Sequence, residues 1–421
     1  MAFLLRSSKF VSCTVAKRFL HSRNSNLARN LASSFLVSQR RDLSAIANVF
    51  SNEELVKVQW EDGKEADFHH IWLRDHCLCK ECLNPATHQR EVDILKLQLN
   101  MAPPKVRVVS DTVKLLWSDG HATDYKSSWL AQHAYKGNKK LRVKEELFLW
   151  DKERINSTTL PEFSFDAVTT NKKDLFEISK AIVKYGFAFV NDTPTELSAV
   201  EKLAKSLGCF VRETHFGRLW AFSNEVMDHA DTAYTSSFLH AHNDNTYFTS
   251  PAGLQMLHCV HHDGKGGESL LVDGFNAANE LKKEHPEAYT FLTTKVLPYR
   301  YIDSERHLKA FGPTIELDPF SKDFHQIRYN HYDRAVIDCL ESDEVPSYYK
   351  AIQAYAEILR RPESEYWFKL VPGQLMVMGN WRVMHGRNRF TGRRDMQGCY
   401  VDKDYFLGQY WSLQEKFQQK V

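Results

Sequence analysis

The stretch QLMVMGNWRVMHGR, residues 374–387, decides the fold that we expect for the larger part of this chain. It follows Pro372-Gly373, a pair typical of turns, and its apolar residues predict a buried β-strand with His385 near its end. The preceding segment PSYYKAIQAYAEILRR (346–361) has the spacing of an amphipathic helix. We therefore expect residues 374–387 to form the last strand of a domain.

The sequence before this stretch changes between helical and strand patterns. KKDLFEISKAIVKYG (172–186) predicts an amphipathic helix that ends at its glycine, and FAFV (187–190) predicts a buried strand. ELSAVEKLAKSLG (196–208) predicts a second helix, and residues 230–335 consist of short aromatic and β-branched runs between turns. Strand-rich sequence between helices predicts an α+β domain, built on a β sandwich or barrel, over residues 160–421.

A smaller β-rich domain is expected over residues 48–150. VKVQWEDGKEADF (56–68) and VKLLWSDGHATDY (113–125) each alternate apolar and polar residues on both sides of an Asp-Gly turn. This pattern is typical of a β-hairpin, and the two hairpins resemble each other. Polar sequence at 135–160 is the expected linker to the larger domain.

The first 41 residues differ in charge from the rest of the chain. They contain eight basic residues and no acidic residue, whereas the remainder has 47 basic and 53 acidic residues, a net charge of −6. An Arg-rich, acid-free, amphipathic start predicts a mitochondrial transit peptide, cut near Arg41. The alternative is a disordered basic arm for nucleic acid or membranes. We do not favour it, because the acidic remainder of the chain has no basic patch that would extend such a binding surface. The sequence also has no run of about 20 apolar residues, the length that spans a bilayer.

The segment AHNDNTYF contains two residues that suit a metal ion, His242 and Asp244. Positions i and i+2 of a strand point to the same face, so both could bind one ion, with His385 as the third ligand. Two imidazoles and one carboxylate are the ligand set of non-haem iron(II) oxygenases, which leaves positions open for a 2-oxo acid and dioxygen. An H-x-D pair alone is weak evidence. A second histidine cluster, which we expect to be polar surface or strand-face residues, consists of His258, His261 and His262.

Two further residues suit an anionic co-substrate. Ser269, in GGESLLVDGF, lies 27 residues after His242, and Arg394, in FTGRRDMQGCY, lies nine residues after His385. The planar guanidinium of arginine binds a carboxylate through two hydrogen bonds, and a serine hydroxyl adds one. These five residues, in this order, predict a site for iron and an anionic co-substrate.

The runs IWLRDHC, RETHFGRLW, DTAYT, HNDNTYF, GGESLLVDGF, RYNHYDRAV and NWRVMHGR carry a resemblance that covers roughly residues 50–410. The chain resembles the γ-butyrobetaine/trimethyllysine dioxygenases of carnitine synthesis. The resemblance implies a double-stranded β-helix (jelly-roll) domain with Fe(II) at His242, Asp244 and His385. It also implies 2-oxoglutarate at Arg394 and Ser269, ascorbate as reductant, and a homodimer. A catalytically silent binding protein on the same fold is disfavoured, because the ligand set is intact.

The substrates of this family carry a quaternary ammonium, which proteins hold against aromatic faces because it donates no hydrogen bond. Trp220, Tyr234 and Tyr400 match the positions of the family's aromatic cage, and Phe216 stands where a tyrosine is usual. Tyr247 is a further candidate beside the iron motif. Core packing is the ordinary alternative for any one of these rings.

The other end of the substrate separates two activities within the family. Trimethyllysine has an α-ammonium as well as a carboxylate, whereas γ-butyrobetaine has only a carboxylate. Asp231, in DTAYT, suits the ammonium, and Asn330, in RYNHYD, suits the carboxylate. A turn or capping role is the alternative for Asp231. The resemblance thus implies hydroxylation of trimethyllysine at C3 in the mitochondrial matrix, with γ-butyrobetaine hydroxylation as the alternative.

Three of the eight cysteines, Cys77, Cys79 and Cys82, lie within six residues. The others stand far apart, so the pattern predicts metal ligands and not a disulfide framework. With His121, from the WSDGH turn, they would complete a tetrahedral zinc site that stabilises the small domain. The arrangement resembles the zinc site of the γ-butyrobetaine branch, which is a point against the choice of trimethyllysine. The alternative imidazole ligands are His76 and His88.

Overall fold

The computed structural model describes residues 45–135, 145–208, 210–224 and 235–418. The chain divides into two compact units, residues 1–137 and 138–421. Within the described residues, no helix combines the length and the apolar character that a membrane span requires.

The first unit contains two three-stranded antiparallel sheets. One consists of β1 (Ile46–Ser51), β2 (Leu55–Trp60) and β3 (Glu65–His69), and the other of β4 (Lys105–Val109), β5 (Thr112–Leu116) and β6 (Ala122–Lys126). A short helix follows each sheet, α2 (His70–Asp75) and α3 (Ser127–His133), and the 3₁₀ turn η1 (Ile94–Lys96) lies between them. Both predicted hairpins are present, as β2–β3 and β5–β6.

The two Asp-Gly turns have the same hydrogen bonds. Gly63 donates to the carbonyl of Trp60, and Gly120 donates to the carbonyl of Trp117, both over 3.0 Å. Both glycines have positive φ, 79° and 84°, which a turn of this type requires and glycine adopts without steric cost. The two tryptophans are buried in one core, so the resemblance between the hairpins extends to their packing.

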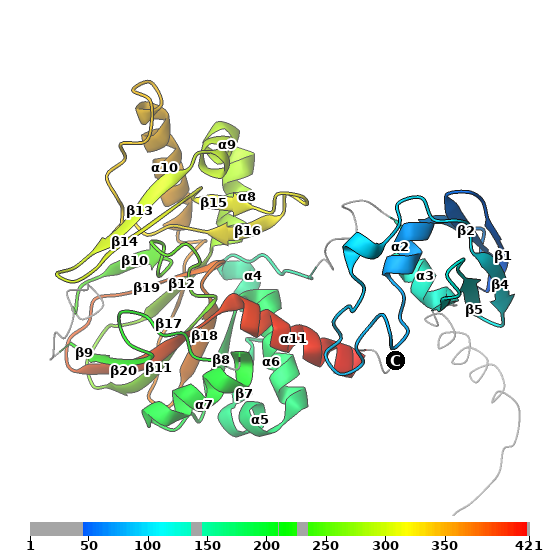
Figure 1. Ribbon diagram of the computed structural model, residues 1–421. Coiled ribbons are helices and arrows are strands. Elements are labelled where there is room, and N and C mark those ends of the chain that lie inside the picture. The colour runs from blue at the N-terminus through cyan, green and yellow to red at the C-terminus, as the bar shows by residue number, and fades with distance from the viewer. Residues whose placement is uncertain (1–44, 136–144, 209, 225–234, 419–421) are drawn as a thin grey trace, which may run out of the picture. The chain divides into compact units, whose positions relative to one another are not determined.

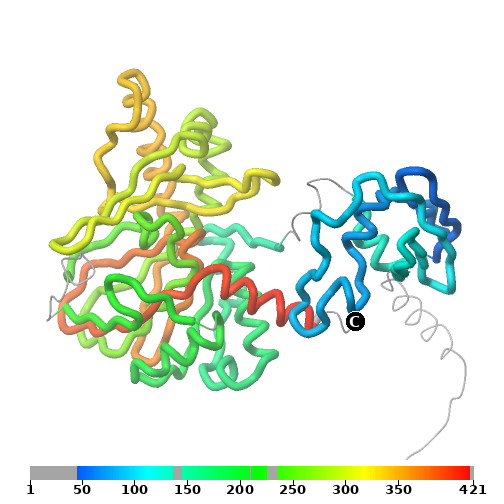
Figure 2. Tube along the Cα trace, viewed as in Figure 1, coloured from blue at the N-terminus to red at the C-terminus, as the bar shows by residue number. Residues whose placement is uncertain are grey.

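The second unit is a sandwich of two β-sheets (Figure 1). The larger sheet has the strand order β7 (Glu162–Ser164), β8 (Phe187–Asn191), β18 (Leu375–Gly379), β11 (Leu254–His262), β20 (Arg394–Val401), β9 (Leu219–Ser223). The smaller sheet has the order β10 (Leu239–His242), β19 (Val383–Arg387), β12 (Ser269–Asp273), β17 (Tyr366–Phe368). All pairs are antiparallel except β7–β8. Figure 2 shows how early, green strands run beside late, orange and red strands in these sheets.

Alternating side chains place each sheet between two apolar layers. Met376 and Met378 of β18 face the interior between the sheets, and Leu375 and Val377 face outward. On that outer side the larger sheet is covered by α5 (Phe165–Thr170), α6 (Lys172–Tyr185), α7 (Leu197–Gly208) and α11 (Lys403–Gln418). The smaller sheet is covered by α8 (Gly274–Glu284), α9 (Pro286–Thr294) and α10 (Val345–Leu359). The expected α+β sandwich is therefore present, with helices outside both sheets.

Four predicted elements agree closely with the structure: α6, which ends before Gly186 in the left-handed conformation, then β8, α7 and α10. The prediction for residues 374–387 is wrong in one respect. This stretch forms two strands, β18 and β19, in different sheets, and β20 follows them as the last strand. Asn380 lies between the two strands, and its side chain holds the turn by donating to the carbonyl of Ala252.

Two other segments differ from expectation. The expected linker at 135–160 contains Trp150 and Ile155, which are buried in the core of the second unit, and the helix α4 (Lys152–Asn156). Residues 274–294, expected as short strands, form α8 and α9. Asp273 caps α8 by accepting from the amide of Phe275, and Pro286 begins α9, so both helix starts have recognisable signals. The strands expected nearby form two hairpins, β13 (Leu297–Ile302) with β14 (His307–Gly312), and β15 (Ile315–Leu317) with β16 (Phe324–Ile327).

Candidate metal and substrate site

Two histidines and one aspartate converge at the edge of the smaller sheet. His242, the last residue of β10, is paired in register with His385 of β19, and their ring centroids are 4.4 Å apart. Oδ1 of Asp244 lies 3.5 Å from Nε2 of His242 and 3.8 Å from Nε2 of His385. One ligand atom from each residue lies within 4.8 Å of the other two, so one metal ion could bind all three.

The sequence predicts that His242 and Asp244 share one face of a strand. Asp244 instead lies just beyond the end of β10, so another contact must place it. The side chain of Asn380 holds it. Oδ1 of Asn380 accepts from the amide of Asp244 over 2.9 Å, and Nδ2 of Asn380 donates to the carbonyl of Asp244 over 2.9 Å. Asn243 donates in turn to the carbonyl of Asn380 over 2.7 Å. These amides fix the H-x-D segment against the turn that leads to His385.

The protonation of His385 and Asp244 suits a cation. Burial lowers the pKa of His385 to about 4, so its imidazole is neutral near pH 7. Burial raises the pKa of Asp244, but the neighbouring imidazoles and the hydroxyl of Tyr400 lower it more, and it lies well below its usual range. Neutral imidazole and ionised carboxylate are the forms that bind metal.

The buried Arg394 has the properties of an anion-binding residue. The residue is only 7% exposed, and its guanidinium has no hydrogen bond or ion pair to any side chain that the structure describes. Burial lowers its pKa to about 10. A buried cation without a counterion is unfavourable, so a bound carboxylate would stabilise it. Arg394 lines the same pocket as the triad, together with the buried Ser269.

Aromatic rings form another wall of this pocket. Trp220 of β9 and Tyr400 of β20 are buried with ring centroids 5.7 Å apart, and Phe216 packs against them. Gly398 pairs in register with Trp220, and a Cβ at this glycine would lie 2.2 Å from the Trp220 ring. The indole therefore depends on glycine at this position of β20. The structure brings three of the five candidate cage residues together in this wall. Tyr247 is buried in another apolar cluster but lines the same pocket, and Tyr234 lies outside the described residues.

Comparison with known proteins agrees with this geometry. Residues 151–400 match the taurine catabolism dioxygenase TauD, TfdA family, and residues 48–131 match the gamma-butyrobetaine hydroxylase-like N-terminal family. Mitochondrial trimethyllysine dioxygenase of Bos taurus is 39% identical over 344 residues, which is 81% of each chain. Trimethyllysine dioxygenase of Neurospora crassa is 32% identical, over 97% of this chain and 92% of the relative. Gamma-butyrobetaine dioxygenase of Pseudomonas sp. is 32% identical, over 88% of this chain and 97% of the relative.

The chain belongs to the γ-butyrobetaine/trimethyllysine dioxygenase family. It is therefore an enzyme of the dioxygenase type. A sandwich of two β-sheets with a His–Asp–His triad at the edge of one sheet is consistent with this membership, and so is a buried arginine in the same pocket.

The pocket of this dioxygenase also contains the predicted residue Asn330, which is 6% exposed. Its Nδ2 donates to Oδ2 of Asp333 over 2.8 Å, and its Oδ1 accepts from the amides of Tyr332 and Asp333. Asn330 thus holds a carboxylate that also lines the pocket. The predicted Asp231 lies outside the described residues.

Sequence reasoning missed several pocket residues. Gln255 of β11 donates to Oδ2 of Asp244 over 2.6 Å, and Arg387, two residues after His385, donates to the carbonyls of Thr235 and Ser237. The position of Arg387 follows from period-two alternation along β19, because residues 385 and 387 share a face. No pattern in the sequence indicates Gln255, because only the order of the strands in the larger sheet brings it beside Asp244. Further pocket residues that the sequence did not indicate are Asn245, Tyr332 and Asp333.

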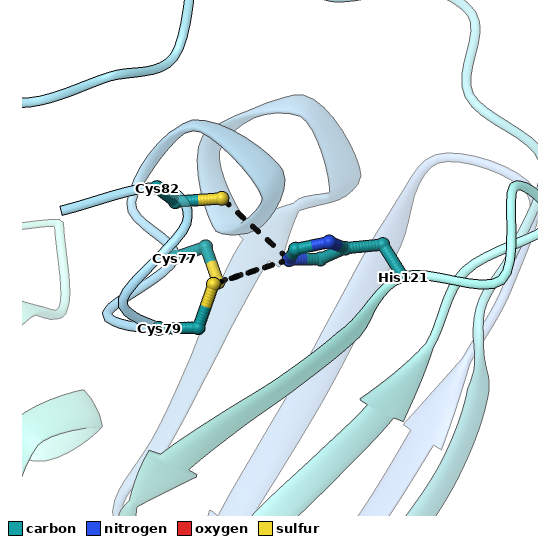
Figure 3. Close-up of side chains that lie close together, drawn as sticks. All are labelled: Cys77, Cys79, Cys82 and His121. Carbon is teal, nitrogen blue, oxygen red and sulfur yellow. Dashed lines mark hydrogen bonds between the residues drawn. The ribbon is translucent and has the colours of Figure 1, made fainter.

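The family's small N-terminal unit brings together Cys77, Cys79, Cys82 and His121 (Figure 3). The sulfur atoms lie 3.3, 3.7 and 3.6 Å from Nε2 of His121, in that order. Ordinary Zn–S and Zn–N bonds in a tetrahedron place such atoms about 3.5 Å apart, so the four side chains fit zinc. The turn at Asp119 orients the histidine, because its Oδ1 accepts from the amide of His121.

The alternative zinc ligands are not part of this cluster. Nδ1 of His76 is 2.8 Å from the carbonyl of Trp72, against whose ring it stacks, and His88 is exposed. The second histidine cluster also differs in part from expectation. His258 is fully buried and hydrogen-bonded to Gln397, whereas His261 pairs with Asp263 at the surface.

Proposed function

We propose that this chain is an Fe(II)- and 2-oxoglutarate-dependent hydroxylase that acts on N6,N6,N6-trimethyllysine at C3. The observation that carries the proposal is the convergence of His242, Asp244 and His385 in one pocket with the buried Arg394, which has no acidic partner among the described residues. The products would be 3-hydroxy-trimethyllysine, succinate and carbon dioxide. The relatives named trimethyllysine dioxygenase support this choice of substrate.

The residues of the triad fit Fe(II), because two imidazoles and one carboxylate leave half of the coordination positions open. Arg394 and Ser269 would bind the distal carboxylate of 2-oxoglutarate. When bound, iron and 2-oxoglutarate supply the oxidising chemistry, in which one oxygen atom of O₂ enters succinate and the other enters the substrate. Ascorbate would keep the iron reduced.

The protein's own part is to position the substrate. The rings of Trp220, Phe216 and Tyr400 would hold the trimethylammonium, with Tyr234 completing the cage. At the other end of the substrate, Asp231 would pair with the α-ammonium and Asn330 would bind the α-carboxylate. Held at both ends, the substrate presents C3 to the triad while the apolar walls exclude water.

Other parts of the proposal concern the rest of the protein. The Cys77, Cys79, Cys82 and His121 cluster would bind a structural zinc ion in the first unit. Residues 1–41 would direct the chain to the mitochondrial matrix, in keeping with relatives that are named mitochondrial. The resemblance also supports a homodimer.

Hydroxylation of γ-butyrobetaine is the second candidate, which the Pseudomonas relative favours. The deciding experiment measures release of carbon dioxide from labelled 2-oxoglutarate with each substrate at equal concentration. We expect kcat/KM for trimethyllysine to exceed that for γ-butyrobetaine by about tenfold or more, because one unpaired polar group in a specific site costs at least this factor. Faster turnover of γ-butyrobetaine would reverse the assignment, and no coupling to either compound would contradict the enzyme.

A further inference from the structure

The first observation concerns Asn245, the residue directly after Asp244. Its side chain is 2% exposed and lines the pocket, yet neither Nδ2 nor Oδ1 has a hydrogen-bond partner within the part of the chain that the structure describes. Its backbone is fixed in the left-handed region at φ 59°, and its carbonyl accepts from the amide of Phe248. A buried carboxamide without partners is costly, so its position in the pocket indicates a polar ligand.

The second observation concerns Asp333, which lines the same pocket. Asn330 fixes this carboxylate from one side by donating to Oδ2, and the backbone of Asp333 donates back to Asn330. Asp333 and all three residues of the triad line this one pocket.

The chemistry of the substrate requires polar groups at this place. C3 of trimethyllysine is bonded to the carbon that bears both the α-ammonium and the α-carboxylate, whereas three methylenes separate C3 from the trimethylammonium. The amino-acid head must therefore lie next to the triad, and the aromatic cage must lie farther away. Asn245 is adjacent to Asp244 in the chain, and the ring of Tyr332, beside Asp333, is 5.8 Å from that of His242.

We infer that Asn245 and Asp333 bind the amino-acid head of the substrate: Asn245 donates to the α-carboxylate, and Asp333 accepts from the α-ammonium. This inference rests on the proposed function. Asp231 is a compatible second partner, because an ammonium has three N–H donors. Asp333 would also select the substrate, since a head group that is only a carboxylate, as in γ-butyrobetaine, would be repelled by it.

The test uses two analogues that each lack one group of the head. One is 6-(trimethylammonio)hexanoate, without the ammonium, and the other is 5-(trimethylammonio)pentylamine, without the carboxylate. Their affinities and that of trimethyllysine are measured by calorimetry on the iron-loaded full chain with 2-oxoglutarate and without oxygen. KM and kcat for trimethyllysine are measured in parallel.

In Asp333→Asn, we expect trimethyllysine and the pentylamine to bind about ten- to a hundredfold more weakly, the worth of one charged hydrogen bond. Binding of the hexanoate should stay within about threefold or improve. KM should rise with little change in kcat. The matched control is Asp338→Asn, because Asp338 is exposed and does not line the pocket.

In Asn245→Gly, which suits the left-handed backbone, the pattern should be opposite. Trimethyllysine and the hexanoate should bind about tenfold more weakly, and the pentylamine should be little affected. The inference is overturned if either variant loses equal affinity for all three ligands, or loses none, provided that the wild type hydroxylates trimethyllysine. A wild type that hydroxylates only γ-butyrobetaine would instead overturn the proposed function, and this inference with it.

Discussion

The hydroxyl of Tyr400 donates a 2.7 Å hydrogen bond to Oδ2 of Asp244. Gln255 donates to the same oxygen over 2.6 Å, while Oδ1 of Asp244 faces His242 and His385. Two donors thus fix one carboxylate oxygen and direct the other to the metal position. Because Tyr400 also belongs to the aromatic wall beside Trp220, one side chain links the proposed cation cage to the triad.

The variant Tyr400→Phe separates these two roles, because it keeps the ring and loses the hydroxyl. We expect iron affinity to fall about tenfold, which is the lower end of the range for loss of an outer-sphere hydrogen bond, because Gln255 still donates to Oδ2 of Asp244. Substrate affinity at saturating iron should change little. Iron titration of the metal-free protein measures the first value, with exposed Tyr405→Phe as control. An unchanged iron affinity would contradict the link.

The second prediction concerns the triad itself. His242→Ala should abolish succinate formation that depends on substrate, because two remaining ligands hold Fe(II) weakly and without the facial arrangement. The control is His261→Ala, since His261 is a surface residue paired with Asp263. Succinate is measured with and without trimethyllysine. Full coupled turnover by the first variant would remove His242 from the proposed iron site.

The third prediction concerns the anion site. Arg394→Gln removes a buried guanidinium that has no acidic partner among the described residues, so folding should be little affected or improved. KM for 2-oxoglutarate should rise about ten- to a hundredfold, since a charge-assisted pair is lost. The neighbouring Arg393→Gln is the control, because Arg393 is paired with Asp395 at the surface. A similar KM for both variants would argue against the assignment.

Local signals explain why much of this fold could be predicted. The helix α6 has a clear apolar face and a glycine terminus, and the two Asp-Gly hairpins have turn residues that few other conformations accept. His242 and Asp244 could be predicted because metal chemistry restricts the ligands to few residue types at a short spacing, and His385 because it stands near the end of a predicted strand. The split of 374–387 into β18 and β19 is harder to predict, because its turn signal is the single pair Gly379-Asn380 and the sequence on both sides of it is apolar.

Contacts between distant residues account for what the sequence did not reveal. Asp244 depends on Asn380, 136 positions away, and on Gln255 and Tyr400, which reach it only through the order β18–β11–β20 in the larger sheet. The hydroxyl of Tyr400 was expected in a cage and not at the triad. Asn245 carries no pattern in the sequence, and only its burial without partners draws attention to it.

The last prediction concerns the Cys₃His cluster. The purified chain should contain about one zinc ion, because three thiolates and one imidazole close a tetrahedral site without an open position. Cys82→Ser should lose most of this zinc and unfold the first unit at lower temperature, since Cys82 is buried and metal binding is coupled to folding. The control is Cys339→Ser, an exposed cysteine in the second unit. Metal analysis and thermal unfolding with and without a chelator give the result. Hydroxylation should be affected less than stability, because the triad lies in the second unit. If the protein without zinc unfolds at the same temperature as the protein with zinc, the four side chains do not serve as a structural metal site.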